Sequence, residues 1–193
     1  MNFRYLALAV GLALTTLAAH AQVGLYINPV AIRISNSQAD TGPFAFLGEN
    51  SKSNIFYGVN IGGYYNFYHQ GKTEVGLDIR DSFTNGNSAT LNSFLVGVRV
   101  ATAPFKRPLK PYLQASVGVG TTRPPTSSVR SNRAQFGIFG GADYTLSRHV
   151  DFRVVEIGFN SLTTASSSTI GGVGSIPASK LLSFSTGLVF RFP

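Results

Sequence analysis

The sequence has no cysteine and no tryptophan, and only 12% of its residues are charged. Without cysteine there is no disulfide framework, no thiolate metal site, no cysteine nucleophile and no cysteine for a lipid anchor. The charged fraction is about half of what a soluble domain usually carries. Beyond its first residues the chain also lacks an apolar run of the roughly 20 residues that a membrane-spanning helix needs. These absences exclude a disulfide-stapled secreted domain and a helical membrane protein.

The start of the chain carries an export signal. Arg4 supplies a positive charge, residues 6–17 are apolar, and Ala19-His20-Ala21 forms an A-x-A cleavage site. This pattern predicts a secretory signal peptide over residues 1–21. The alternative, an anchor helix, needs a longer apolar stretch than this segment offers. We therefore expect residues 22–193 to form one exported domain.

The last stretch of the chain, residues 181–192, alternates between two kinds of side chain, with Thr186 interrupting the apolar face. Phe184, Leu188 and Phe190 share one face with Phe192, whereas the other face is small or charged and ends in Arg191. A period of two is typical of a β-strand. In a soluble protein the aromatic face would point into a core, and in a transmembrane barrel it would point into lipid.

Seven further segments show a similar alternation, and together they decide between these two interpretations. Eight strands is an even number, and each is near the 9–11 residues or so that a tilted membrane strand needs. The connections after the second, fourth and sixth strands are short. Those after the odd strands are mostly longer, as in outer-membrane barrels, and include polar loops at residues 36–53, 84–88, 121–132 and 161–179. The pattern predicts an all-β, eight-stranded antiparallel up-and-down transmembrane β-barrel with both chain ends on the periplasmic side. The seven segments are residues 24–35, 54–68, 74–80, 90–103, 112–120, 133–146 and 150–160.

The predicted inward face carries charges of both signs. Eight strands leave an interior just wide enough for side chains, and buried charges persist when they are paired and hydrogen-bonded. We expect an internal ion-pair network that plugs the lumen, because the lumen is narrow and both signs are present; a proton or ion path is the alternative. The predicted network comprises Glu74, Asp78, Arg80, Arg99, Asp143, Glu156 and Arg191, with Gln114 also facing inward.

The outward aromatic residues are expected to form two girdles at the membrane interfaces, although the core of a soluble sheet would use such residues too. The inner girdle comprises Tyr68, Phe105, Tyr144, Phe152 and Phe192, and the outer one Phe56, Tyr57, Phe83, Phe136 and Phe159.

The end of the chain resembles a known signal. Ser185-x-Gly187-x-x-Phe190-x-Phe192 is similar to the C-terminal assembly signal of outer-membrane proteins, although Pro193 stands where such proteins usually end in Phe. The architecture of residues 22–193 also resembles the small eight-stranded outer-membrane barrels of the OmpA-barrel, OmpX or opacity-protein type. The resemblance implies a Gram-negative outer membrane, with its lipid, its lipopolysaccharide and its assembly machinery as partners.

The net charge of +8 comes from scattered basic residues. No basic run suggests nucleic acid, and an anionic lipid or lipopolysaccharide surface is the expected counterpart, unless the charge reflects only genome bias. Arg123, Arg130 and Arg133 form a modest basic group near the third polar loop.

The sequence offers no catalytic constellation. His69 and His149 lie in predicted periplasmic turns, whereas a Ser, His and carboxylate enzyme needs these groups in contact. No metal-spaced histidine cluster or phosphate loop is present, so we expect no enzyme, cofactor or metal. The expected role is structural or adhesive, with surface ligands bound by the outer loops. The alternatives are a small low-conductance pore and, less favoured, a lipid-modifying outer-membrane enzyme.

Overall fold

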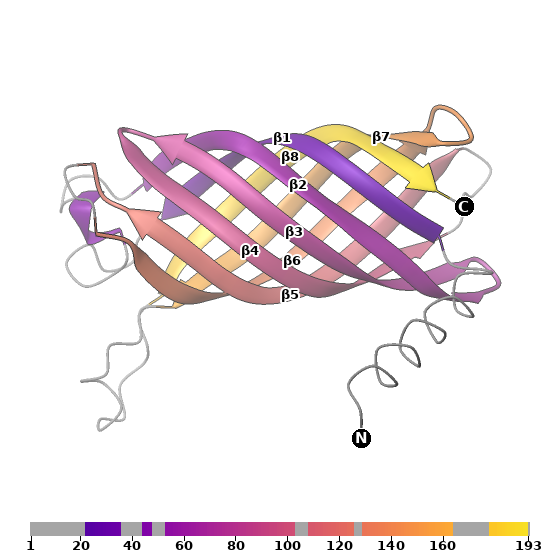
Figure 1. Ribbon diagram of the computed structural model, residues 1–193, viewed down its shortest axis with the longest axis horizontal. Coiled ribbons are helices and arrows are strands. Elements are labelled where there is room, and N and C mark those ends of the chain that lie inside the picture. Colours follow the sequence, from indigo (N-terminus) through magenta and orange to yellow (C-terminus); the bar gives the residue numbers. More distant parts are fainter. Residues whose placement is uncertain are drawn as a thin grey trace, which may run out of the picture.

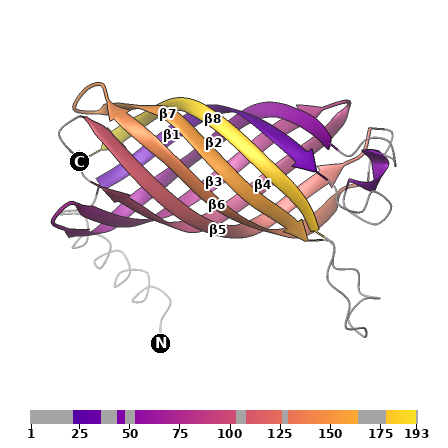
Figure 2. The same cartoon turned by 180° about the vertical axis from the view of Figure 1, so that it is seen from behind.

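The computed structural model describes residues 22–35, 44–47, 53–102, 108–125, 129–163 and 178–192. Eight antiparallel strands pair in sequence order, and β8 pairs with β1 to close one barrel (Figure 1, Figure 2). The predicted fold class is therefore confirmed, while the predicted signal segment, residues 1–21, lies outside the described residues. No helix in the described ranges is long and apolar enough to cross a membrane. The elements are β1 Gln22–Ser35, η1 Ala45–Leu47, β2 Ser53–Gln70, β3 Thr73–Gly86, β4 Ala89–Thr102, β5 Leu109–Arg123, β6 Ser131–Thr145, β7 Val150–Thr163 and β8 Ala178–Phe192.

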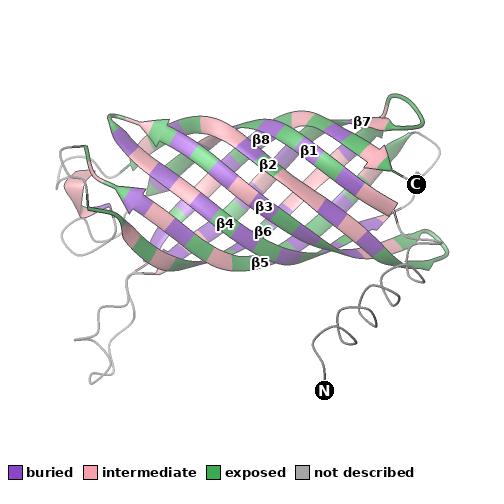
Figure 3. Cartoon of the chain, viewed as in Figure 1, coloured by how far each residue is buried: buried purple, intermediate pink, exposed green. Residues whose placement is uncertain are grey.

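Burial alternates along the strands of the barrel, with an interruption in β7 (Figure 3). The exposed positions carry most of the large apolar side chains. Phe159 is 66% exposed, whereas Glu156, three residues earlier on β7, is 2% exposed. Large apolar side chains ring the whole outer wall, and many polar and charged ones lie inside. In water this much exposed apolar surface would be strongly unfavourable. The outer wall is therefore suited to contact with the hydrocarbon of a membrane.

The connections sort between the two ends of the barrel. Gly71 and Lys72 join β2 to β3, and residues 146–149 join β6 to β7, at the end where β1 starts and β8 stops. Residues 36–52, 124–130 and 164–177 join strands at the opposite end. This asymmetry is the one that outer-membrane barrels show, with short turns in the periplasm and longer loops outside. We refer to the two ends as inner and outer accordingly.

One outer connection is much shorter than predicted. The polar loop expected at residues 84–88 is wrong, because β3 and β4 remain paired up to Gly86 and Ala89. Asn87 and Ser88 alone make the turn, with φ of 48° and 61°. Positive φ at both central residues is the geometry of a type I′ hairpin. Asn-Ser is a weaker signal for this turn than Asn-Gly, which explains why the pattern looked like a loop.

A β-bulge interrupts the alternation of β7. Its pairing with β8 shifts between Arg153 and Glu156, so both of these residues point inward while Val154 and Val155 both point outward. An extra residue of this kind reverses the side-chain phase of the strand. The ambiguous phase of the sequence around residues 151–154 is the signature of this bulge.

The outer half of the lumen is apolar. Val30, Ile32 and Ile34 alternate with Ala31 and Arg33, and their apolar face points inward. Placing Phe56 in the outer girdle was wrong, because its side chain is fully buried in the lumen. An apolar lumen cluster results from Val30, Ile32, Ile34, Phe44, Phe56, Ala89, Leu91, Leu162 and Leu181, with Phe46 and Leu47 packed against it.

The other predicted girdle residues can now be placed. Phe105 lies outside the described residues. The remaining eight side chains are exposed on the outer wall: Tyr57, Tyr68, Phe83, Phe136, Tyr144, Phe152, Phe159 and Phe192.

Replacing Ser88 by glycine should stabilise the barrel by about 0.5 kcal/mol, because glycine adopts positive φ without the steric cost that serine carries. Urea unfolding in lipid vesicles, followed by the gel mobility of folded and unfolded protein, measures the change. Asn85→Gly is the control, since β3 is extended there and glycine should destabilise it. Equal effects of the two substitutions would contradict the turn geometry.

Candidate functional site

The centre of the lumen holds three arginines and three carboxylates, none more than 3% exposed. They come from four strands, so the group forms only when the barrel closes. With equal numbers of each sign, the layer is formally neutral. The residues of this charged layer are Asp78 and Arg80 on β3, Arg99 on β4, Asp143 on β6, and Arg153 and Glu156 on β7.

Glu156 is the most connected member. Its two oxygens accept bonds from Nη1 and Nη2 of Arg80, at 2.7 and 2.8 Å, in a bidentate arrangement. The Tyr112 hydroxyl donates to the same carboxylate at 2.6 Å, the Ser185 hydroxyl at 3.1 Å and Nη1 of Arg153 at 3.3 Å. Planar bidentate pairs of this kind are among the strongest and most directional hydrogen bonds in proteins. This carboxylate therefore ties β3, β5 and β8 to β7.

Asp143 holds the other two arginines. Nη2 of Arg99 donates to its Oδ2 at 3.0 Å, and Nε of Arg153 donates to its Oδ1 at 2.9 Å. Arg153 thus bridges Asp143 and Glu156, and it links the two halves of the charged layer.

Asp78 completes the layer through neutral donors. The Tyr26 hydroxyl lies 3.0 Å from both carboxylate oxygens, and Nε2 of Gln114 donates at 2.7 Å. Nε of Arg80 lies 3.9 Å from Oδ1 of Asp78 and donates to the Tyr26 hydroxyl at 3.1 Å. The buried carboxylate is thereby satisfied without a close guanidinium of its own.

Aromatic rings stack on each guanidinium. Arg99 lies between Tyr64 and Tyr112, with its Cζ 4.1 and 4.3 Å from their ring centroids. Arg80 is 4.2 Å from the Phe139 centroid, and Arg153 is 4.6 and 4.8 Å from the Tyr26 and Tyr112 centroids. Desolvated cation–π contacts of this kind contribute roughly 2 kcal/mol each. The lumen is therefore filled by alternating rings and guanidinium planes.

Glycines on the inner wall make room for these rings. A Cβ on Gly24 would lie 2.3 Å from the Tyr64 ring, and one on Gly158 would lie 2.5 Å from the Phe139 ring. Only glycine permits such close approach of a ring to the strand backbone.

Two predicted members of the network lie outside the charged layer, near the inner end. Glu74 accepts a bond from Nδ2 of Asn66 at 2.8 Å and lies 3.9 Å from Nε2 of His69. Arg191 forms an ion pair with Asp151, with Nε 2.8 Å from Oδ2, and Nζ of Lys110 lies 3.6 Å from the same oxygen. The geometry thus separates an inner-end group from the central layer.

Sequence reasoning missed Arg153, Asp151 and the inward tyrosines. The β7 bulge hid Arg153, since a single period of two across residues 150–160 cannot place both Arg153 and Glu156 inside. The tyrosines left a usable signal. Tyr26 and Tyr64 share the inward face of their strands with glycine or asparagine.

The residues of the predicted assembly signal divide between the two faces of β8. Ser185 faces inward and contacts Glu156, and a Cβ on Gly187 would lie 2.3 Å from the Asn28 side chain. Phe190 and Phe192 are exposed on the outer wall. Their use as an assembly signal stays a prediction.

The described residues do not bring catalytic groups together. His69 and His149 lie at the inner end of the barrel, both exposed. Within the described ranges no three His, Cys, Asp or Glu side chains could hold a metal ion. The arrangement can cross-link strands and fill space.

Comparisons with known proteins agree with this geometry. Residues 5–192 match the family described as outer membrane protein beta-barrel domain. Among solved structures, Neisserial surface protein A is 16% identical with a TM-score of 0.56, over 88% of this chain and 97% of that one. Ail, the attachment invasion locus protein of Yersinia pestis, is 10% identical with a TM-score of 0.52, over 89% and 99%. A second Ail structure, in complex with the heparin analogue sucrose octasulfate, has a TM-score of 0.50. At such identities the likeness shows the fold alone, and comparison with curated protein sequences gives no significant match.

Glu156→Gln should lower the free energy of unfolding by about 3–5 kcal/mol, because it leaves two buried guanidiniums without their shared counter-charge. Urea unfolding of the barrel in lipid vesicles measures the loss. Glu74→Gln is the matched control; its carboxylate is partly exposed, so the loss should stay within about 1 kcal/mol. Similar losses in both variants would contradict the central role of Glu156.

Proposed function

Because the chain belongs to the family of outer-membrane β-barrel domains, we propose that it is a plugged barrel with a structural or adhesive role, presenting outer loops to surface ligands. The family match supports a location in the outer membrane, among lipid and lipopolysaccharide. The export signal over residues 1–21, the barrel over residues 22–193 and delivery to the assembly machinery through the last strand are parts of the same proposal.

The observation that supports the plug is the small free volume between the two halves of the described lumen. A void of about 10 Å³, lined by Val30, Arg80, Leu95, Phe139 and others, separates the charged layer from the apolar cluster. Such a volume holds at most about one water molecule. An ion would have to break the Arg80–Glu156 pair and then cross the apolar cluster, which offers no polar ligand in exchange. Two seals of opposite chemistry thus support a closed lumen over a small pore.

The adhesive role is supported by the combination of a rigid barrel with exposed loops. The strands form a rigid, internally cross-linked scaffold, and such scaffolds commonly carry binding on their loops. Arg123 and Arg130 are exposed at the outer end of β5 and in the segment before β6. Ail, which shares this fold, was crystallised with a sulfated sugar. An anionic glycan or a lipopolysaccharide phosphate is therefore the ligand chemistry we propose for the loops.

We propose no enzymatic activity. A lipid-modifying enzyme needs its nucleophile and base near the outer leaflet, whereas His69, at the end of β2, and His149, between β6 and β7, lie at the inner end.

In planar bilayers the purified barrel should show no sustained conductance steps. The triple variant Arg80→Ala, Glu156→Ala and Phe56→Ala removes an ion pair from the charged layer and a ring from the apolar lumen cluster. It should show conductance steps, because both barriers to ions are then opened. Asp151→Asn with Arg191→Gln, near the inner end, is the control and should stay silent. Stable ohmic steps from the unaltered barrel would overturn the plug and support the small-pore alternative. Gel mobility confirms that each variant is folded before it is measured.

Cells that display the barrel should bind a sulfated polysaccharide such as heparin, and Arg123→Gln with Arg130→Gln should weaken this binding several-fold. The physical reason is the loss of two exposed cations on the loop side, and binding should also fall with rising salt. Arg148→Gln, in an exposed inner-end turn, is the charge control. Unchanged binding in the double variant would remove these arginines from the ligand site, and replacing residues 164–177 by a short turn tests the remaining long loop.

A further inference from the structure

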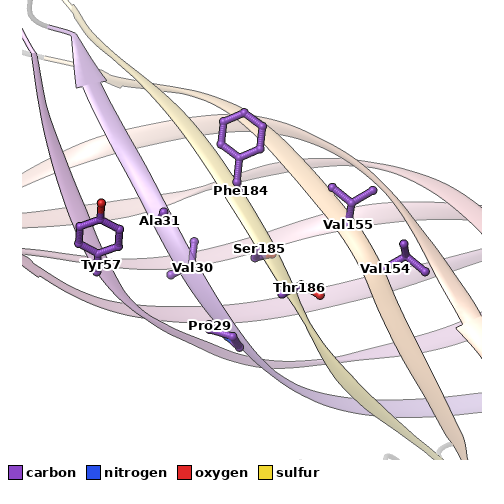
Figure 4. Close-up of a pocket in the computed structure, with 9 residues that line it drawn as sticks. All are labelled: Pro29, Val30, Ala31, Tyr57, Val154, Val155, Phe184, Ser185 and Thr186. Carbon is purple, nitrogen blue, oxygen red and sulfur yellow. The ribbon is translucent and has the colours of Figure 1, made fainter.

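An open groove of about 400 Å³ runs along the outer wall where β7, β8 and β1 meet (Figure 4). Its lining is almost wholly apolar. Tyr57 and Phe184 stand on either side of Ala31, and both are its cross-strand partners. The lining residues are Pro29, Val30, Ala31, Tyr57, Val154, Val155, Phe184, Ser185 and Thr186.

The local backbone explains why the wall is hollowed here. Pairing of β1 with β8 skips from Ile27–Leu188 to Val30–Ser185, at the position of Pro29, which has no N–H to donate. The β7 bulge faces the same region, and the Thr186 hydroxyl donates to the backbone oxygen of Arg153 at 2.8 Å. Small side chains form the floor, while rings and the bulged valines form the walls.

Two cations lie directly beyond the outer end of the groove. Arg33 is two residues further along β1 than Ala31, on the same outward face, and Lys180 is at the start of β8. Arg33 pairs with Leu182 and Ser35 pairs with Lys180, so the two cations are diagonal neighbours across the β1–β8 pair. Diagonal neighbours have Cβ atoms roughly 7 Å apart, within reach of long side chains. Both side chains are exposed.

The depth of these features matches the layers of a bilayer leaflet. Tyr57 belongs to the predicted outer girdle, which would mark the interface, and Phe184 lies across Ala31 from it. Arg33 lies one outward position further toward the loops, roughly 5 Å higher on a tilted strand. The groove therefore lies at the depth of acyl chains, and the two cations lie at the depth of headgroups.

We propose that this wall binds one phosphorylated glycolipid of the outer leaflet, such as the lipid part of lipopolysaccharide. An acyl chain would lie in the groove between Tyr57, Phe184 and Val155, and a phosphate would be held between Arg33 and Lys180. Charge complementarity selects this occupant, because an apolar groove capped by two cations matches an amphiphile with an anionic head. The site rests on the proposed orientation, with the long loops outside, and it is independent of the plug and of the loop ligand.

A second groove supplies an internal comparison. It has about 480 Å³ and lies on β5, β6 and β7, with Ala115, Phe136, Ile138 and Phe159 in its lining. The next outward-facing positions beyond it on β6 and β7, which include Ala134, Asn132 and Thr163, carry no charge. Acyl chains of ordinary lipids can pack into either groove. A difference in lipid retention between the two grooves therefore reports the contribution of the cations.

Titration of the detergent-solubilised barrel with rough-form lipopolysaccharide bearing two lipid phosphates, followed by native mass spectrometry, tests the site. The unaltered barrel should retain one molecule. Arg33→Gln with Lys180→Gln should weaken retention about 10- to 30-fold, since each cation near an anionic lipid surface contributes roughly a three- to fivefold change in affinity. Ala31→Leu, which fills the groove, should also weaken it.

Matched controls separate the site from general effects. Lys72→Gln with Arg148→Gln removes the same charge at the inner end, and Ala115→Leu fills the second groove; both should retain the lipid as the unaltered barrel does. Gel mobility shows that each variant is folded.

Four outcomes would overturn the proposal. They are equal retention by the Arg33/Lys180 variant, equal retention of enzymatically dephosphorylated lipopolysaccharide, equal retention of phosphatidylglycerol, and displacement of the lipid by millimolar inorganic phosphate. The third would indicate a general anionic-lipid surface, and the last a simple anion site. Conductance and heparin binding do not enter this test, so its failure leaves the plug and the loop ligand standing.

Discussion

The closed hydrogen-bonded ladder is the constraint on which everything else in this molecule depends. A chain in hydrocarbon must satisfy its backbone N–H and C=O groups internally, and pairing of β8 with β1 leaves the sheet without an open edge. Closure also decides the chemistry of the two faces. The wall must be apolar outside, so the polar and charged side chains can be placed only in the lumen, where they need partners of their own.

The narrow lumen then selects an unusual core. Three guanidiniums, three carboxylates and four rings fill the middle of the barrel, and each guanidinium both pairs with an anion and stacks on a ring. Removing one partner leaves a buried charge, so the layer tolerates little change. The apolar cluster beyond it follows a simpler rule, because Leu91, Phe56 and Ile34 need no partners, and it excludes water from the charged layer on the outer side.

Much of this fold could be predicted from the sequence, because period-two alternation reports directly which face a residue occupies. Asp78, Arg80, Arg99 and Glu156 were predicted inside for that reason. The pattern says which residues share a face, but it cannot say whether an apolar face meets lipid or another apolar face, and this is why Phe56 was misplaced. The pattern also does not show at which level of the lumen an inward residue lies. For this reason Glu74 and Arg191, near the inner end, could not be distinguished from the charged layer. The two-residue turn at Asn87 and Ser88 was not predicted, because it depends on positive φ angles that these residue types indicate only weakly.

The bulge in β7 has a consequence that reaches both sides of the wall at once. One additional residue sets Arg153 and Glu156 together inside and leaves two adjacent valines outside. No series of side-chain substitutions can undo that arrangement, because the change of phase belongs to the length of the strand. Without the bulge, the odd spacing of Arg153 and Glu156 would turn one end of β7 over, carrying Arg153 into hydrocarbon and Phe152 into the lumen. Deleting Val154 or Val155 would leave a regular strand with both charges still inward and in register with β8, so β7 can lose its extra residue without losing the inward pair.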